Sequence, residues 1–483
     1  MHESRIGAGP HTRWNGRLVG LVAVLVLVNF MVDTAITAPL LVLPEMLDYF
    51  GTDQAAWLNA SAMLAGVMWA PLLGKSADVH GKRKVLVLTL LISCAGALVC
   101  AVAPTIWVFI PGRLLQGAAV AAMFLTVAIV RDVCAPRIAM VIVGIVTSGS
   151  AVLNIASRFL TEKLAAEFGF QILFLVSAVV AVTMAICVRK VIPESLIRTP
   201  GRIDVGGALL LGGGLAGVLS YVSLGSEFGW LAFGPLVLLV GGITAFARWF
   251  LVSSRKPDSL IDVRNLGAPL VLTLLVLVLS TGSYQSMLQL VPLIGDISAD
   301  QRLGYGLAGQ GTVALLLAAP GIGVMIGGPV AGALAARIGP ASTLAGGVAL
   351  GTVGTIGMFL GVSQFPAALF FAFLLGFTVG ALGTSGFNMA GSLAPADRQG
   401  IVSSLVMVVI AIGSVVLNFV GAAVLKSTTV VADGETVNSA TGVFTYITIA
   451  TTAFAIAAVL VVMLVRKSRV SPRTPSPASL RRS

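Results

Sequence analysis

Long, uninterrupted apolar segments constrain the fold of this chain more than any other feature. The 483 residues are 57% hydrophobic and only 10% charged, and the mean hydropathy is +1.01. A helix of about 20 apolar residues crosses the hydrocarbon core of a bilayer. Lipid offers no hydrogen-bond partners to the backbone, so only helices and closed barrels can span it. The apolar segments are continuous rather than alternating, which predicts an all-α membrane protein.

The predicted architecture has 14 transmembrane helices, arranged as two six-helix bundles with two extra helices between them. The expected spans are 18–44, 55–73, 85–103, 106–130, 138–160, 168–188, 205–224, 231–252, 267–294, 308–335, 341–361, 364–390, 401–425 and 441–465. The corresponding regions are a cytoplasmic tail (1–17), the N-terminal bundle (18–190), a linker with the extra helices (191–265), the C-terminal bundle (266–466) and a disordered cytoplasmic tail (467–483).

The distribution of basic residues predicts the orientation. An even number of spans places both termini on one side of the membrane, and 25 of the 30 Lys and Arg residues fall on that side. Cytoplasmic loops carry the excess of basic residues, so both termini are expected in the cytoplasm of a multi-pass protein of the plasma (inner) membrane. This asymmetry also accounts for the net charge of +11, so a nucleic-acid partner is not expected.

The chain contains no recognisable P-loop, catalytic triad or metal-ligand spacing. The four cysteines lie in or beside apolar segments without paired spacing, which is typical of small packing residues. We therefore expect a protein that is not an enzyme, needs no cofactor or metal, and acts as a monomer in the bilayer.

Charge is concentrated in the segment GKSADVHGKRK at residues 74–84, and part of its pattern recurs later in the chain. With the preceding residues it reads P-x-x-G-x-x-A-x-x-x-G from Pro71 to Gly81, and the same pattern runs from Pro329 to Gly339. The offset is 258 residues, and both copies end the second helix of a six-helix block. Two similar halves are the plan of many secondary transporters. In the second copy, Ala336 replaces the acidic residue Asp78.

The segment resembles the loop motif of the major facilitator superfamily, G-x-L-A-D-R-x-G-R-K-x-x-L. The residues that match by identity or class are Gly74, Ala77, Asp78, Gly81, Arg83 and Leu86. In the fourth span, Arg113-Leu-Leu-Gln116-Gly117 is similar to the R-x-x-Q-G motif of drug:proton antiporters. Fourteen helices resemble the larger branch of those antiporters. The fifth helix departs from this branch, because residues 157–162 read SRFLTE where antiporters carry G-P-x-x-G-G.

We expect the loop motif to form a conformational clasp between the two bundles. Asp78 lies at the C-terminal end of a helix, where the helix dipole disfavours an anion. Its expected partner is Arg83, Arg131 or the start of the span near Ile401. The clasp would favour an outward-facing state. Its predicted members are Gly74, Asp78, Gly81, Arg83, Arg131 and Asp132. The alternative is that the basic residues of the loop only anchor the topology.

Two charges within the spans are predicted to couple transport to protons. Asp33 and Arg113 fall at similar depth in the outer half of the membrane, and an unpaired charge there is costly. Mutual pairing is the expected solution, with Asp33 as the protonatable carboxylate: burial favours its neutral form and Arg113 its ionised form. The alternative is a permanent structural ion pair.

Substrate contacts are harder to read from the pattern. The expected contacts are Trp69, Gln116, Phe124, Tyr284, Gln285 and Gln289, although aromatic residues in a membrane helix usually pack against neighbours. Together with the resemblance, the pattern predicts a transporter that exports amphiphilic small molecules, such as drugs or secondary metabolites, by proton antiport with alternating access. The alternatives are a proton-coupled symporter, a lipid or metabolite carrier, and a non-transporting membrane sensor on the same scaffold.

Overall fold

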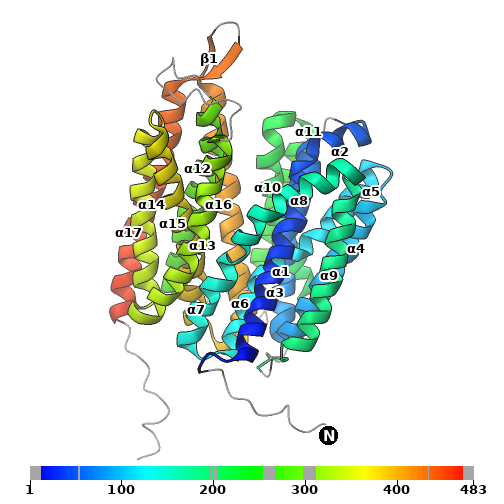
Figure 1. The fold of residues 1–483 in the computed structure, drawn as a ribbon, viewed down its shortest axis with the longest axis vertical. Coiled ribbons are helices and arrows are strands. Elements are labelled where there is room, and N and C mark those ends of the chain that lie inside the picture. The colour runs from blue at the N-terminus through cyan, green and yellow to red at the C-terminus, as the bar shows by residue number, and fades with distance from the viewer. Residues whose placement is uncertain are drawn as a thin grey trace, which may run out of the picture.

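The computed structural model describes residues 12–52, 55–195, 197–198, 204–253, 267–296, 312–432 and 435–470. Most of this part of the chain is helical, and the helices run along one axis of the molecule (Figure 1). The N-terminal bundle contains α1 (Gly16–Leu41), α2 (Leu43–Phe50), α3 (Ala55–His80), α4 (Lys82–Ala101), α5 (Ile106–Gln116), η1 (Gly117–Ala119), α6 (Val120–Val133), α7 (Pro136–Ser148), α8 (Ser150–Phe168) and α9 (Gln171–Val191).

The remaining elements form the C-terminal bundle and the connection to it. The connection contains α10 (Val205–Phe228) and α11 (Phe233–Ser253). The C-terminal bundle contains α12 (Ala268–Asp296), α13 (Thr312–Ile338), α14 (Pro340–Gly361), α15 (Phe365–Leu393), η4 (Ala396–Arg398), α16 (Gln399–Ser427) and α17 (Ala440–Val470). Between α16 and α17, β1 (Thr429–Ala432) and β2 (Glu435–Asn438) pair antiparallel. The sequence analysis did not predict this hairpin.

Local chemistry explains several helix boundaries. The side chain of Asn15 accepts a hydrogen bond from the amide of Leu18 at the start of α1, and Asp204 does the same at α10. Such side chains satisfy amides that have no partner within the helix. Gly81 and Gly339 have positive φ angles of 105° and 91° at the tight turns after α3 and α13, a conformation that suits glycine. Both glycines end a copy of the repeated pattern.

Twelve helices in the described residues are long and apolar enough to cross a membrane. They overlap twelve of the fourteen expected spans. Most ends agree to within five residues, but the spans expected at 18–44 and 267–294 end at Thr37 and Leu288, and the one expected at 308–335 begins at Ala318. The two other expected spans, 55–73 and 138–160, fall on α3 and on the pair α7 and α8, which are not among the twelve. The structure therefore establishes an all-helical membrane protein with twelve candidate spans. The expected tails lie partly outside the described residues, which begin at residue 12 and end at residue 470.

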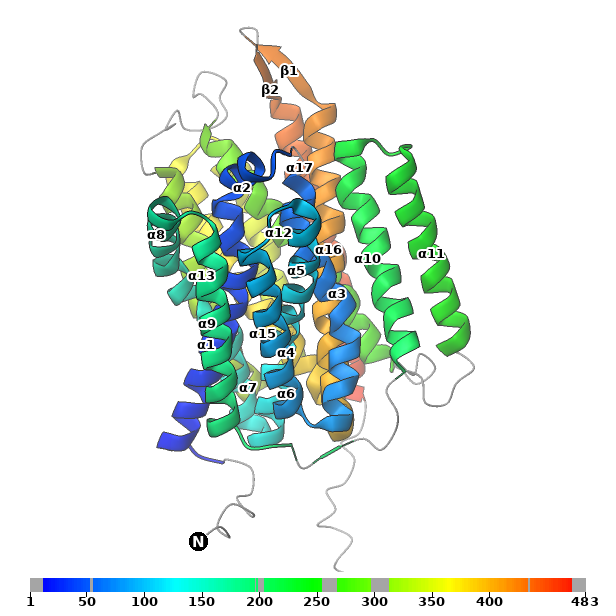
Figure 2. The same cartoon turned by 90° about the vertical axis from the view of Figure 1, so that its right-hand side faces the viewer.

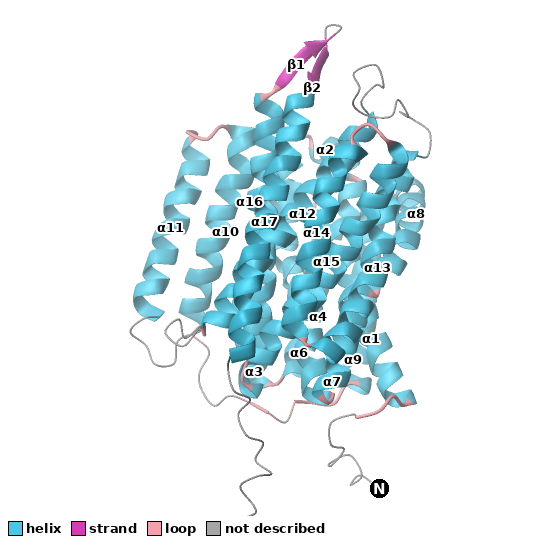
Figure 3. Ribbon diagram, turned by 90° about the vertical axis from the view of Figure 1, so that its left-hand side faces the viewer, coloured by secondary structure: helices cyan, strands magenta, loops and turns pink. Residues whose placement is uncertain are grey.

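The start of α1 and the end of α17 lie at the same end of the molecule, which we call the terminal side (Figure 1). The hairpin projects from the other end, which we call the distal side (Figure 2). The extra helices stand beside the bundles, with α11 outermost (Figure 3). α10 packs against α3 and α16, whereas α11 packs against α10. The bundles meet mainly where α3 contacts α16 and where α7 contacts α13.

Candidate functional site

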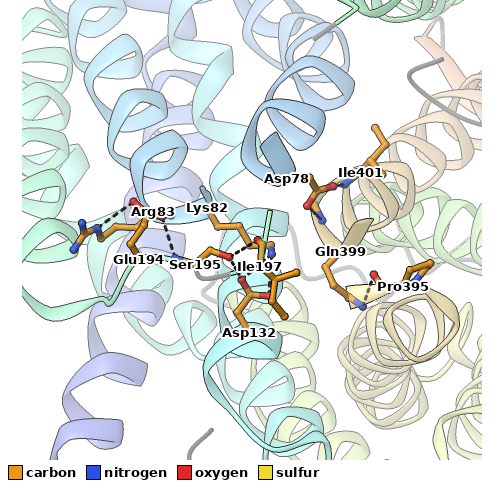
Figure 4. A network of polar contacts seen from close by, with 11 residues as sticks. Asp78, Lys82, Arg83, Asp132, Glu194, Ser195, Ile197, Pro395, Gln399 and Ile401 are labelled. Atoms are coloured by element: carbon orange, nitrogen blue, oxygen red, sulfur yellow. Dashed lines mark hydrogen bonds and ion pairs between the residues drawn. The ribbon is translucent and has the colours of Figure 1, made fainter. Parts of the chain in front are cut away.

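The carboxylate of Asp78 binds the N-terminus of α16 on the terminal side. The amide of Gly400 donates a hydrogen bond of 2.8 Å to Oδ1, and the amide of Ile401 donates one of 2.9 Å to Oδ2 (Figure 4). Asp78 is buried. A helix N-terminus carries unpaired amides and partial positive charge, so it suits an anion. Of the three expected partners, the structure therefore selects the start of α16.

Close packing of the two backbones makes this contact possible. A Cβ atom on Gly74 would lie 2.8 Å from the Ser404 hydroxyl and 3.0 Å from the Gly400 carbonyl. The same crossing occurs in the second half of the chain, where a Cβ on Gly332 would lie 2.6 Å from the carbonyl oxygen of Met140. The repeated pattern thus places one glycine at each of the two crossings between the bundles.

Burial opposes ionisation of the Asp78 carboxyl. Asp78 lies beyond the expected span 55–73, and its burial raises the pKa of the carboxyl to about 6, although the amides of Ile401 and Gly400 act in the opposite direction. The two hydrogen bonds therefore do not fully offset the cost of removing the charge from water. A contact of modest net stability can break and re-form during a conformational cycle.

The basic residues that follow Asp78 pair within the N-terminal half of the chain. Lys82 is 1% exposed, and its Nζ lies 2.8 and 2.7 Å from the two carboxylate oxygens of Asp132. The Ser195 hydroxyl also donates to Asp132. Arg83 contacts Glu194, with Nε 3.5 Å from Oε2. The alternative in which Arg83 pairs with Asp78 is therefore wrong: Arg83 and Lys82 instead bind the start of the linker and the end of α6 (Figure 4).

Arg131 makes a second contact across the bundles, and it too does not pair with Asp78. Its Nη2 donates to the carbonyl oxygens of Phe387 and Asn388 in the last turns of α15, at 3.1 and 3.0 Å. The carbonyls at a helix C-terminus carry partial negative charge and favour a cation. Arg131 thus binds carbonyls near the end of α15, and Asp78 binds the amides at the start of α16, so the two contacts lie on either side of the short connection between these helices. The clasp between the bundles therefore consists of these two contacts. Arg83 and Asp132, which were also expected in it, instead pair with Glu194 and Lys82.

Gly391 provides the space for the Arg131 guanidinium, because a Cβ there would lie 2.2 Å from Nε. We expect Gly391→Ala to displace this side chain. The loss of charged hydrogen bonds should destabilise the terminal-side contact by about 1–3 kcal/mol, which exceeds the gain of roughly 1 kcal/mol from alanine in a helix. Gly383, in the same helix, has open space around its Cβ position. Thermal unfolding should show destabilisation for Gly391→Ala and none for the control Gly383→Ala; equal effects would contradict the role of Gly391.

Within the bundle, Arg113 and Asp33 do not form the expected ion pair. Arg113 is fully buried, and its Nη1 donates to the carbonyl of Ala35 at 3.0 Å and to Oε1 of Gln116 at 2.6 Å. The ion pairs among the described residues are Lys82–Asp132 and Arg83–Glu194. The prediction of mutual pairing is therefore wrong for this conformation. Backbone carbonyls of α1 take the place of the carboxylate, two residues beyond Asp33.

Asp33 is partly exposed, and its described partners are neutral groups on α8. Nδ2 of Asn154 donates to Oδ2 at 2.9 Å, and the Ser150 side chain lies near the carboxylate. One turn earlier on α1, the buried amide of Asn29 donates to the Val146 carbonyl. Neutral donors can adjust to either protonation state of a carboxyl, whereas a fixed cation would hold it ionised.

The six residues proposed as substrate contacts lie in different environments. Phe124 is fully buried, and so is Gln116, which accepts from Arg113 and donates to Ser177. The indole of Trp69 donates to the Leu114 carbonyl, and Tyr284 belongs to the core of the C-terminal bundle. These positions support packing in this conformation. Gln285 is half-buried. The side chain of Gln289 lies outside the described residues.

Sequence reasoning missed several polar residues. Asn154, Ser150 and Asn388 are uncharged residues within apolar segments, and none of them belongs to a motif that would draw attention to it. The contact between Lys82 and Asp132 joins residues 50 positions apart, and no pattern in the loop motif indicates it. Glu194 had a signal, since it is the first acid after a basic helix end.

The comparison with known families agrees with this arrangement of two clasped bundles. The sequence profile described as Major Facilitator Superfamily matches residues 24–205, 204–417 and 303–482. The chain belongs to the Major Facilitator Superfamily. Members of this superfamily are membrane transporters for small molecules, not enzymes.

Two curated relatives indicate how varied the similar transporters are. The uridine/deoxyuridine transporter of Lactococcus lactis subsp. cremoris is 28% identical over 414 residues, which cover 81% of this chain and 83% of that protein. The multidrug resistance protein B homolog of Mycobacterium tuberculosis is 27% identical over 358 residues, 72% of this chain and 64% of that protein.

Solved structures support the fold. The human organic anion transporter MFSD10 has a TM-score of 0.63 and 17% identity, covering 93% of this chain and all of that one. The proton:xylose symporter XylE also has a TM-score of 0.63, with 13% identity over 92% of this chain and 94% of that one. These similarities show that the chain has the fold of those two proteins.

Proposed function

We propose that this protein exports amphiphilic small molecules, such as drugs or secondary metabolites, by proton antiport with alternating access. The observation that carries the proposal is the environment of Asp33: a half-buried acidic residue deep in α1, whose described partners are neutral side chains of α8. Ionisable groups inside a membrane domain usually serve ion or substrate pathways. Among the described side chains no cation pairs with this carboxylate, so it can gain and lose a proton during the cycle.

Alternating access also requires contacts that close one side of the transporter, and the clasp provides them. Asp78 and Arg131 join the bundles on the terminal side, which we assign to the cytoplasm from the excess of basic residues there. The structure then corresponds to a state closed toward the cytoplasm. Opening requires both contacts to break, and rocking of two repeat-related bundles is the usual motion in such transporters.

The proposal includes the topology and the oligomeric state. We infer 14 spans, because α3 and the pair α7–α8 lie among the long helices of the bundles (Figure 1). We also propose that the protein acts as a monomer in the plasma membrane. α3 has 26 residues, and α7 and α8 are separated only by Gly149. This count would place the protein with the fourteen-helix drug:proton antiporters.

A second candidate function is proton-coupled symport of a metabolite. Two observations favour it: residues 157–162 lack the G-P-x-x-G-G pattern of antiporters, and one similar protein is a uridine/deoxyuridine transporter. The direction of the proton distinguishes the two. An antiported substrate competes with the proton, whereas a symported substrate binds together with it.

The test measures protons on addition of substrate to purified protein in weak buffer with a pH indicator. We expect lipophilic drugs to release protons. Proton uptake on addition of uridine would favour symport instead. Proton coupling in either direction would be refuted by two results together: substrate neither releases nor takes up protons, and the rate of transport into liposomes does not depend on a pH gradient.

A further inference from the structure

An open hollow of about 600 Å³ lies on the terminal side, where α7 meets α13 and α14. Its lining comes from both bundles and contains two arginines but no acidic residue: Pro136, Arg137, Met140 and residues 335–340. Arg137 and Arg337 are exposed, and neither belongs to the ion pairs of the described residues. Two unpaired cations at one joint repel each other, so an anion placed between them would stabilise the joint.

The internal repeat identifies this hollow as the counterpart of the Asp78 contact. Asp78 corresponds to Ala336, which lines the hollow. The helix packed against the first copy is α16, and the helix packed against the second copy is α7. Asp78 binds the amides at the start of α16, whereas the start of α7 has no side-chain cap. The second joint thus keeps the backbone geometry of the first but lacks its carboxylate.

An apolar ridge leads along α13 to the hollow. Ile322, Ile326, Val330, Leu334 and Ile338 follow one another at four-residue intervals, and each is between 38% and 57% exposed. Residues four apart are neighbours on a helix surface, so these five form a row that winds gradually around α13. Ile338 also lines the hollow. An anion with acyl chains would match both features, because its chains could follow the ridge while its headgroup reached the arginines.

We propose that the hollow binds the phosphate headgroup of an anionic phospholipid of the terminal-side leaflet and that this lipid replaces the missing carboxylate of the second repeat. The headgroup would bridge Arg137 of one bundle and Arg337 of the other, so it binds best when the terminal side is closed. Only the effect on closure rests on the proposed alternating access; lipid binding does not depend on it.

The first test counts retained lipids by native mass spectrometry. The full-length protein is taken from nanodiscs of phosphatidylcholine, alone or mixed with phosphatidylglycerol. We expect preferential retention of phosphatidylglycerol, reduced by about fivefold for each of the changes Arg137→Gln and Arg337→Gln. The control is Arg17→Gln, an exposed arginine on the same side that does not line the hollow. If the double variant Arg137→Gln/Arg337→Gln retains as much phosphatidylglycerol as the control, the proposal is overturned.

The second test measures closure with spin labels at Lys190 and Arg466, at the terminal ends of α9 and α17. Phosphatidylglycerol should increase the closed population of the wild type, whereas inorganic phosphate added to phosphatidylcholine discs should not. If inorganic phosphate increases the closed population equally, the ligand of the hollow is a free anion, and its assignment as a phospholipid is overturned. Ala336→Asp should increase the closed population without phosphatidylglycerol and should reduce lipid retention. If this variant does not fold, the lipid retention of Arg137→Gln and Arg337→Gln decides whether the proposal holds. Unchanged lipid dependence in a folded Ala336→Asp protein would also overturn the proposal.

Discussion

Replacing Asp33 by asparagine is expected to abolish proton-driven transport while the protein remains folded. The change removes the titrating group but keeps the size and one oxygen, which can still accept the hydrogen bond from Asn154. Arg113 keeps its partners, the Ala35 carbonyl and Gln116, so no buried cation loses its counter-charge. Transport driven by a pH gradient in proteoliposomes should fall to background, whereas exchange of substrate down its own gradient should persist.

Two companion variants make the Asp33 test specific. Asp33→Glu keeps a carboxylate and should retain part of the activity. Asn154→Ala keeps Asp33 but removes its donor, so we expect coupling to survive with a shifted pH dependence. Substrate should release protons from the detergent-solubilised wild type and not from Asp33→Asn. Full pH-driven transport by the asparagine variant would refute Asp33 as the proton carrier, since asparagine cannot titrate.

Replacing Asp78 by asparagine is expected to shift the protein toward the state open on the terminal side. The carboxylate offers one oxygen to each of two amides, of Gly400 and Ile401. An asparagine offers one oxygen and places its NH₂ group against the other amide, which leaves a buried donor without an acceptor. This costs about 1–3 kcal/mol, which corresponds to a roughly 5- to 150-fold change in the ratio of the two states.

The measurement is the distance distribution across the terminal side, with the same labels at Lys190 and Arg466. The matched control is Asp48→Asn, because Asp48 is an exposed acid of α2 at the distal side (Figure 1). If Asp78→Asn and the control give the same distribution as the wild type, Asp78 does not hold the bundles together, and the basic residues of its loop are topology anchors only.

The sequence by itself determined the class of the protein and the position of its helices. Bilayer thickness fixes the length of an apolar span, so continuous segments such as 85–103 and 341–361 reappear as helices with little change in their ends. The repeated pattern also contains the glycines Gly74 and Gly332. The sequence predicted a contact between the bundles at the first copy, and the structure shows that a small residue allows two backbones to approach at both.

Only the tertiary structure decided which charges meet. From depth alone, Asp33 and Arg113 were expected to pair, yet backbone carbonyls of α1 satisfy Arg113 and α8 supplies the partners of Asp33. Depth gives a position along the membrane normal but not the direction in which a side chain leaves its helix. Arg83, Lys82 and Arg131 likewise could not be assigned from spacing, because their partners lie in segments brought together by helix packing.

The proposal for the hollow at Arg137 and Arg337 depends on the sequence repeat as well as on the folded structure. The repeat in the sequence shows that Ala336 stands where the first copy has an acid. Only the folded chain shows that this position lines a hollow together with α7 residues and two arginines that belong to neither ion pair of the described residues. Apolar spans are specified locally by the solvent that surrounds them. Polar contacts between helices depend on rotation and crossing, which are set by the packing of the whole bundle.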